Sequence, residues 1–124
     1  MSPAPADIWT VLADFYRQQK RWTDLDTAIQ NCQAAETKDK NPSVALYDGA
    51  GVLIAAKRNP SIAATMLEAY LASSSLTEDA PAFIAHIRLS RLKQQLGDAA
   101  GAQSELAAAA AMAKEFSPAQ DPQP

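Results

Sequence analysis

The segment WTVLADFY, Trp9–Tyr16, carries the clearest indication of how the chain folds. Trp9 and Tyr16 are seven residues apart, or about two turns of an α-helix, so both lie on one face. Ile8, Leu12 and Ala13 complete this apolar face. Such a face can grip a ligand or fill the space between helices. Because burying an aromatic side chain removes about 150–250 Å² from water, we interpret the pair as packing against the second helix.

Length, charge and composition exclude several classes of protein. A chain of 124 residues can form one domain whose core needs neither metal nor disulfide. Its formal net charge is −3, and no basic block marks a nucleic-acid site. No apolar run approaches the roughly 20 residues that span a bilayer, and the single cysteine, Cys32, cannot form an internal bridge. We expect a soluble, cytoplasmic protein without nucleic-acid binding or membrane insertion.

Helix is the only regular structure that the alanine-rich composition supports, because strand-forming residues never alternate over a useful length. Proline, glycine and polar clusters divide the chain into six expected helices. Their expected ranges are about 6–19, 23–37, 42–57, 60–72, 79–96 and 99–116. Expected helix signals are a Thr23/Asp26 capping box, caps at Asn41, Asn59 and Asp98, and a left-handed stop at Gly97.

The helix pairs resemble one another in sequence. The first pair overlays the second with a shift of about 37 residues, and the third with a further shift of about 40. Small residues coincide where two helices must touch, and larger apolar residues coincide one turn away. The matched sets are Ala13, Ala50 and Ser90; Leu25, Ile62 and Ala102; Ile29, Met66 and Leu106; and Cys32, Ala69 and Ala109.

Two motifs resemble those of the tetratricopeptide repeat (TPR) family. W-x-x-L-A-x-x-Y from Trp9 to Tyr16 resembles the first-helix signature, and L-G-D-x-x-x-A from Leu96 to Ala102 resembles the turn and second-helix start. The middle repeat departs from the pattern at Leu46 and Gly49. The resemblance implies an all-α superhelix of three TPR-like hairpins at about 6–37, 42–73 and 79–116. These would form a single domain, 1–118, before a disordered tail, 119–124.

The resemblance also implies a function. Stacked hairpins present their first helices along a concave groove that binds an extended peptide or a partner helix. The groove residues expected from the overlay are Asp7, Thr10, Asp14, Arg17, Tyr47, Asp48, Gly51, Ile54, Ile87, Arg88, Arg91 and Gln95. This set is acidic, then apolar, then basic, and a ligand of opposite polarity would complement it. The alternative interpretation is a solvated face.

One named sub-type of repeat does not fit. Repeats that clamp the terminal carboxylate of chaperones carry lysine, asparagine and arginine in the groove. The corresponding places here hold Thr10, Asp14, Asp48, Ile87 and Arg91, of which only the last matches. We therefore do not expect a chaperone-tail clamp.

No pattern of residues indicates catalysis. His86 has only Ser90 nearby in sequence, without an acidic residue to orient it. Cys32 lies on an apolar stripe without a neighbouring base. No set of His, Cys or acidic residues has metal-ligand spacing, and Gly49-Ala50-Gly51 lies inside a helix, where close helix approach explains it better than a phosphate loop. We expect a non-enzymatic scaffold without cofactor or metal.

The alanine-rich segment ELAAAAAMAKEF, Glu105–Phe116, suggests a second function. It favours helix but buries little area. It can be a closely packed terminal helix or a docking face for a neighbour. The alternative function is therefore a self-associating assembly element, or part of a longer repeat array, that uses this helix.

Overall fold

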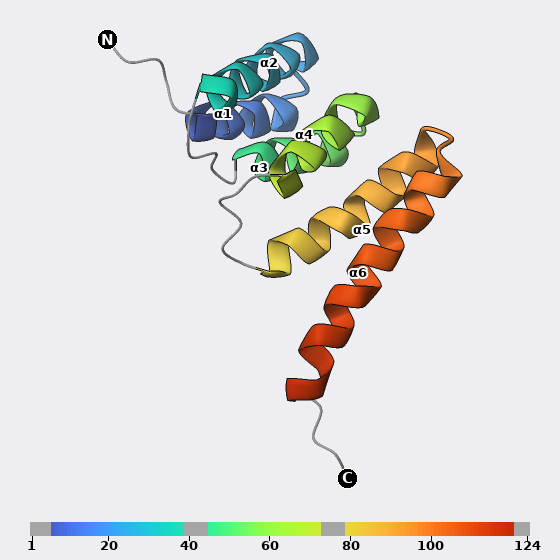
Figure 1. Cartoon of the computed structure of the whole chain (residues 1–124). Coiled ribbons are helices and arrows are strands. Elements are labelled where there is room, and N and C mark those ends of the chain that lie inside the picture. The colour runs from blue at the N-terminus through green and yellow to red at the C-terminus, as the bar shows by residue number, and fades with distance from the viewer. Residues whose placement is uncertain (1–5, 39–44, 73–78, 121–124) are drawn as a thin grey trace. The chain divides into compact units, whose positions relative to one another are not determined.

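The chain is all-α. The computed structural model describes residues 6–38, 45–72 and 79–120, and within these ranges it contains six helices and no strand (Figure 1). The prediction of an all-α fold is confirmed. The helices are α1 Ala6–Gln18, α2 Trp22–Lys38, α3 Ala45–Ala56, α4 Pro60–Ala72, α5 Asp79–Gln95 and α6 Ala99–Gln120.

The helices belong to two compact units. Unit 1 is Met1–Leu76 and holds α1 to α4, while unit 2 is Thr77–Pro124 and holds α5 and α6. In unit 1, α1 pairs with α2, α3 pairs with α4, and α3 also packs against both α1 and α2. In unit 2, α5 pairs with α6 (Figure 1). A single superhelical domain over 1–118 stays a prediction.

The core of unit 1 combines large aliphatic side chains with small residues at close helix contacts. Its largest fully buried side chains include Leu25, Ile29, Leu53, Met66 and Leu67. Gly49 supports the predicted close approach, because a Cβ added there would lie 2.6 Å from the Met66 Cε atom and 3.7 Å from the Ile29 Cδ1 atom. A side chain at this position would therefore push into its neighbours.

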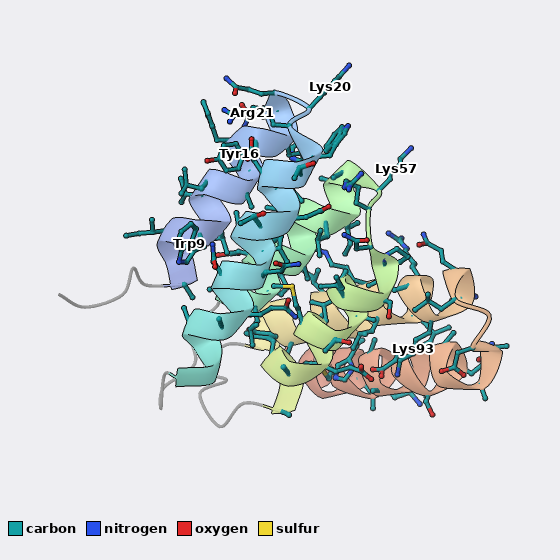
Figure 2. The ribbon with its side chains drawn as sticks, turned by 90° about the horizontal axis from the view of Figure 1, so that it is seen from above. Trp9, Tyr16, Lys20, Arg21, Lys57 and Lys93 are labelled. Atoms are coloured by element: carbon teal, nitrogen blue, oxygen red, sulfur yellow. The ribbon has the colours of Figure 1, made fainter. Side chains whose placement is uncertain are left out.

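All three hairpins end their first helix in the same way. A residue one or two positions after each first helix is in the left-handed region, with φ of 59° at Lys20, 57° at Lys57 and 84° at Gly97. The next amide donates back to a carbonyl five residues earlier: Arg21 to Tyr16 at 2.9 Å, Arg58 to Leu53 at 3.0 Å and Asp98 to Lys93 at 2.8 Å. These are the hydrogen bonds of a Schellman motif. The left-handed stop predicted at Gly97 is confirmed, and Figure 2 shows the Lys20 and Lys57 side chains pointing away from their turns.

Two of the predicted caps are confirmed. The Asn59 carbonyl accepts the Ala63 amide at 3.0 Å, directly before Pro60 starts α4. At α6, the Asp98 Oδ1 atom accepts the Gly101 amide at 2.9 Å. The Asn41 cap lies outside the described residues.

The capping box predicted at Thr23 is wrong. Helix α2 begins one residue earlier, at Trp22, and the Arg21 carbonyl accepts the Leu25 amide at 3.0 Å. Thr23 is therefore already helical and cannot act as the N-cap. The box partner Asp26 instead binds the α3–α4 turn, where the Arg58 Nη2 atom donates to its Oδ2 atom at 2.7 Å.

The second helices overlay with a slip of one residue. The residues whose carbonyls start α2, α4 and α6 are Arg21, Asn59 and Asp98. The α3–α4 turn therefore contains one residue more than the other two turns. The corrected matched sets are Leu25, Ala63 and Ala102; Ile29, Leu67 and Leu106; and Cys32, Tyr70 and Ala109. The slip explains why Ile62 is only half-buried and Ala69 is exposed, although the sequence overlay matched them to core residues.

Helix α6 also runs past its expected end at Phe116. It extends to Gln120 and includes Pro118. A proline there removes one backbone hydrogen bond, while the preceding alanines favour helix strongly. Residues 119 and 120 are therefore helical rather than part of the expected tail.

Candidate functional site

The predicted groove residues of unit 1 lie on two neighbouring first helices, α1 and α3, which pack side by side. Asp14 on α1 and Gly51 on α3 occupy equivalent repeat positions, as do Arg17 and Ile54. All four are half-buried. These positions combine a charged pair on α1 with a glycine and an apolar side chain on α3.

The charges on the α1 part of this surface neutralise one another. The Arg17 Nε atom donates to the Asp14 Oδ1 atom at 2.9 Å, and the Gln18 Nε2 atom donates to the Asp14 Oδ2 atom at 3.1 Å. A partly exposed ion pair of this kind contributes little to stability, about 0–1 kcal/mol. The acidic end expected from the sequence is therefore locally an acid–base pair, because Arg17 follows Asp14 by one helical turn.

Two predicted groove residues are placed differently. Thr10 is only 5% exposed, so its expected exposure to a ligand is wrong. Thr10 on α1 is covered by α3 at Gly49, where the lack of a side chain lets the two helices approach closely. A Cβ added at Gly49 would lie 3.6 Å from the Thr10 Cγ2 atom. The half-buried Tyr47 ring packs in a tilted arrangement against the Tyr70 ring of α4, with ring centroids 5.3 Å apart.

The remaining groove predictions divide between the units. Asp48 is exposed on α3, and the side chain of Asp7 lies outside the described residues. On α5 in unit 2, Ile87 and Arg88 are half-buried, whereas Arg91 and Gln95 are exposed. A single groove that combines the α1, α3 and α5 residues stays a prediction.

Trp9 and Tyr16 lie at the margin of the core rather than inside it. Both are half-buried. The Arg21 guanidinium lies 4.8 Å from the Tyr16 ring centroid, and Figure 2 shows the two side chains at the same end of α1. Residues of the same hairpin therefore contact Tyr16, which agrees with a packing role and supplies no sign of a ligand cage.

Sequence reasoning missed an exposed apolar surface on α1. Ile8 is 49% exposed, Val11 71% and Phe15 49%. Their spacing of three and then four residues aligns them along one side of the helix. Ile8 was expected on the buried face instead. The same spacing rule could have predicted this second apolar stripe. The W-x-x-L-A-x-x-Y pattern lies in the same segment, and it was used to assign the buried face.

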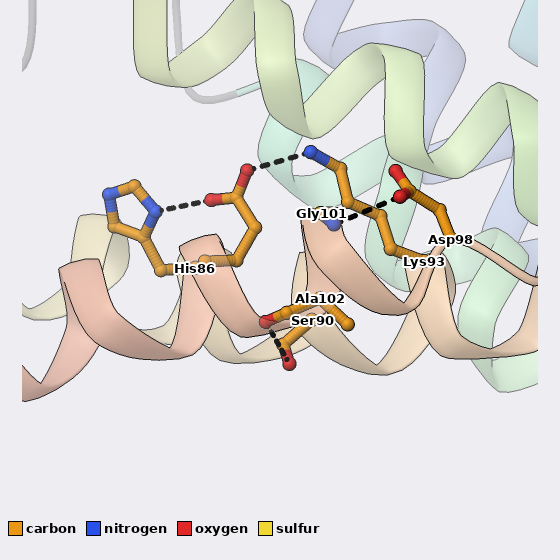
Figure 3. A network of polar contacts seen from close by, with 7 residues as sticks. His86, Ser90, Lys93, Asp98, Gly101 and Ala102 are labelled. Atoms are coloured by element: carbon orange, nitrogen blue, oxygen red, sulfur yellow. Dashed lines mark hydrogen bonds and ion pairs between the residues drawn. The ribbon is translucent and has the colours of Figure 1, made fainter.

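A second feature missed by sequence is a polar network in unit 2 (Figure 3). The His86 Nδ1 atom lies 2.7 Å from the Glu105 Oε1 atom, and the Lys93 Nζ atom donates to the Glu105 Oε2 atom at 2.9 Å. Burial raises the pKa of Glu105, but hydrogen bonds and charges from Lys93 and His86 outweigh it and leave this pKa below its ordinary value. Glu105 is thus the acidic partner that the sequence around His86 lacks.

This network does not assemble a nucleophile around His86. The buried Ser90 hydroxyl donates to the Ala102 carbonyl at 2.9 Å, as Figure 3 shows. A hydroxyl committed to a backbone carbonyl is not positioned to give its proton to a histidine. The contacts of His86, Ser90 and Lys93 instead connect α5 to α6. The absence of enzymatic activity stays a prediction.

In the described ranges, no group of three or more His, Cys, Asp and Glu side chains could hold a metal ion. Similarly, none of the described helices has the length and apolarity to cross a membrane.

Comparison with known proteins identifies no relative: no protein-family model matches the chain, and no curated protein or solved structure is significantly similar to it.

Proposed function

We propose that this protein is a TPR-like helical-repeat module that binds a peptide or partner helix along its first helices and acts as a non-catalytic scaffold. The observation that carries the proposal is the packing of α3 against both α1 and α2. Each first helix of a stacked array packs in this way on the preceding hairpin, and the stack then offers its first helices as a binding surface. The shared hairpin turn supports the same interpretation.

The binding surface proposed for unit 1 consists of Asp14, Arg17, Gly51 and Ile54. Gly51 is half-buried and carries no side chain that would hold a partner's backbone away, and Ile54 offers apolar contact. The Asp14–Arg17 pair offers one acceptor and one donor group to a polar partner. We propose a segment with an apolar side chain flanked by charges, because such a segment would complement both features.

An exchange of the charged pair tests the proposal. Reversing Asp14 alone would place two cations one turn apart, so the better variant is Asp14→Arg with Arg17→Asp, which keeps an ion pair and inverts the surface charge. The matched control exchanges Arg21 and Asp24, another pair three residues apart, 2.7 Å from Nη2 to Oδ2, at the α1–α2 turn.

The measurement is affinity capture from an extract of the source organism, with bound proteins identified for each variant. We expect a protein that the unaltered chain and the control exchange retain, and that the Asp14/Arg17 exchange loses. Circular dichroism checks that helicity is unchanged. If the Asp14/Arg17 exchange retains the same proteins as the unaltered chain, the proposed surface is wrong.

A further inference from the structure

The contact between the two hairpins of unit 1 defines how one hairpin receives the next. The α2 side contributes Ile29, whose Cδ1 atom lies 3.7 Å from a Cβ added at Gly49, and Cys32, whose Sγ atom lies 3.9 Å from the Ala45 carbonyl oxygen. On the α3 side, Ala45 is fully buried, and Val52, two helical turns further along α3, is 8% exposed. The second helix of one hairpin thus packs on the first helix of the next.

The same α2 positions recur on α6, where one of them is exposed. In the corrected overlay, Ile29 corresponds to Leu106, and Cys32 corresponds to Ala109, which is 1% exposed. Ile29 is 1% exposed, whereas Leu106 is 46% exposed. Gln103 and Ala110, one turn to either side of Leu106, are also exposed. We call Gln103, Leu106 and Ala110 the tail face.

The α3 positions recur on α1, again uncovered. With the shift that aligns Lys20 with Lys57, Ile8 corresponds to Ala45 and Phe15 to Val52. Ile8 and Phe15 are both 49% exposed, while their α3 counterparts are buried. We call Ile8 and Phe15 the head face. The side chains of Ile8 and Phe15 are larger than their α3 counterparts. The tail face contains a small residue, Ala110, and an exposed apolar one, Leu106, against which they can pack.

We propose that the head face of one copy packs on the tail face of a second copy, as α3 packs on α2 within each chain. The occupant is a second copy because this chain carries both halves of the contact that its own hairpins already make. Such a contact is heterologous, so it leaves one free head and one free tail and can add further copies. It depends on the corrected repeat equivalence and not on the proposed peptide-binding surface.

A polar contact accompanies the internal interface and has a counterpart across the proposed one. The Arg58 Nη2 atom donates to the Asp26 Oδ2 atom at 2.7 Å, and the Arg58 guanidinium lies 5.4 Å from the Trp22 ring centroid. The residue equivalent to Arg58 in the first turn is Arg21, and the residue equivalent to Asp26 on α6 is Gln103. Arg21 of one copy would thus meet Gln103 of the other, an amide in place of a carboxylate.

The test measures the mass of the full chain by sedimentation equilibrium over a range of concentrations. The head variant is Ile8→Asp and the tail variant is Leu106→Glu, and both replace exposed side chains, so folding should be retained. The unaltered chain should show a mass that rises with concentration, and each variant alone should remain monomeric. A chain that is strictly monomeric over the range would overturn the proposal.

Mixing the two variants distinguishes head-to-tail packing from a symmetric contact. The Ile8→Asp chain keeps its tail face, and the Leu106→Glu chain keeps its head face. An equimolar mixture should therefore form a complex that stops at two chains, while each variant alone remains monomeric. If the Leu106→Glu chain alone still dimerises, the contact is a symmetric pairing of α1 and the proposal is wrong.

Val11→Asp is the matched control, because Val11 is equivalent to Asp48, which is exposed on α3. It introduces the same charge on α1 as the head variant, one turn away, and should leave association unchanged. A loss as large as that caused by Ile8→Asp would contradict the assigned register. Circular dichroism of all variants checks that helicity is retained.

Gln103→Asp is expected to strengthen association, because it restores the carboxylate that Asp26 supplies internally. For an exposed ion pair we expect a gain of about twofold to fivefold, lowered by salt. Adding Arg21→Ala in the same chain should remove the gain. An unchanged or weaker association in Gln103→Asp would count against the register of the interface.

Discussion

Glu105 connects both helices of unit 2 with its two carboxylate oxygens. One oxygen meets His86 and the other meets Lys93, at 2.7 and 2.9 Å. The three side chains are each about one-fifth exposed or less, so water screens them less than it screens a surface pair. A carboxylate that is partly buried and bonded twice stabilises the pairing of the helices only in its ionised form.

This network predicts how stability depends on pH. The pKa of Glu105 in the folded chain is lowered from its ordinary value of 4.5. Its contribution is therefore fully present above about pH 4.5 and is lost as the pH falls through the folded-state pKa. We expect Glu105→Gln to destabilise unit 2 at neutral pH by about 1 kcal/mol, and this difference from the unaltered chain to shrink in acid.

The measurement is thermal unfolding followed by circular dichroism between about pH 7 and about pH 3. Asp24→Asn is the control, because its ion pair with Arg21 is exposed on both sides, and it should change the profile far less. Parallel pH profiles for Glu105→Gln and the unaltered chain would show that the network contributes nothing.

At this scale, sequence reasoning fails where a partner is distant in the chain. Glu105 lies nineteen residues after His86, so no local pattern connects them. Thr10 shows the same limit: its exposure depends on how closely α3 approaches, which Gly49 decides from another helix. The Asp14–Arg17 pair, in contrast, lies within one turn and could have been predicted from its spacing.

The repeated hairpin turn is the clearest regularity among the elements. The left-handed position is held by Gly97 in unit 2 and by Lys20 and Lys57 in unit 1. Left-handed backbone costs a residue with a Cβ roughly 1–2 kcal/mol, and glycine avoids this cost. The two lysine turns therefore keep strain that the glycine turn lacks.

We expect Lys57→Gly to stabilise the chain by about 1 kcal/mol, and Gly97→Lys to destabilise it by a similar amount. No atom lies within 4 Å of a Cβ added at Gly97, so the second effect is conformational and not a clash. Urea unfolding at equilibrium measures both changes. The control is Lys114→Gly, inside α6, where glycine should destabilise by about 1 kcal/mol. If Lys57→Gly and Lys114→Gly changed the free energy of unfolding in the same direction, the interpretation of the left-handed turn would be wrong.

The sequence predicts the existence and order of the elements well, because proline, glycine and cap residues act locally. The bounds of α4 and the Gly97 stop are confirmed. The register of the second helices could not be predicted, because the extra residue in the turn before Pro60 is visible only through backbone hydrogen bonds. That one residue decides whether Leu67 or Met66 is equivalent to Ile29.

On the scale of the whole molecule, the two units differ in how much core they contain. Unit 1 stacks one hairpin on another and holds Leu25, Ile29, Leu53 and Met66 among its fully buried side chains. Unit 2 is one hairpin, and Leu89 is its member of the same group of largest buried side chains. A single repeat hairpin cannot bury its apolar face alone. This difference also explains why unit 2 leaves Leu106 exposed.

The difference predicts that the units fold unequally when separated. We expect a fragment of residues 1–76 to unfold in urea through one cooperative transition, because α3 packs on both helices of the first hairpin. A fragment of residues 77–124 should lose helicity gradually, since two helices without a stacked neighbour bury too little area to offset chain entropy. Both fragments are followed by circular dichroism beside the full chain, at low concentration to limit association. Cooperative unfolding of 77–124, or gradual unfolding of 1–76, would show that core size does not set the stability of the two units.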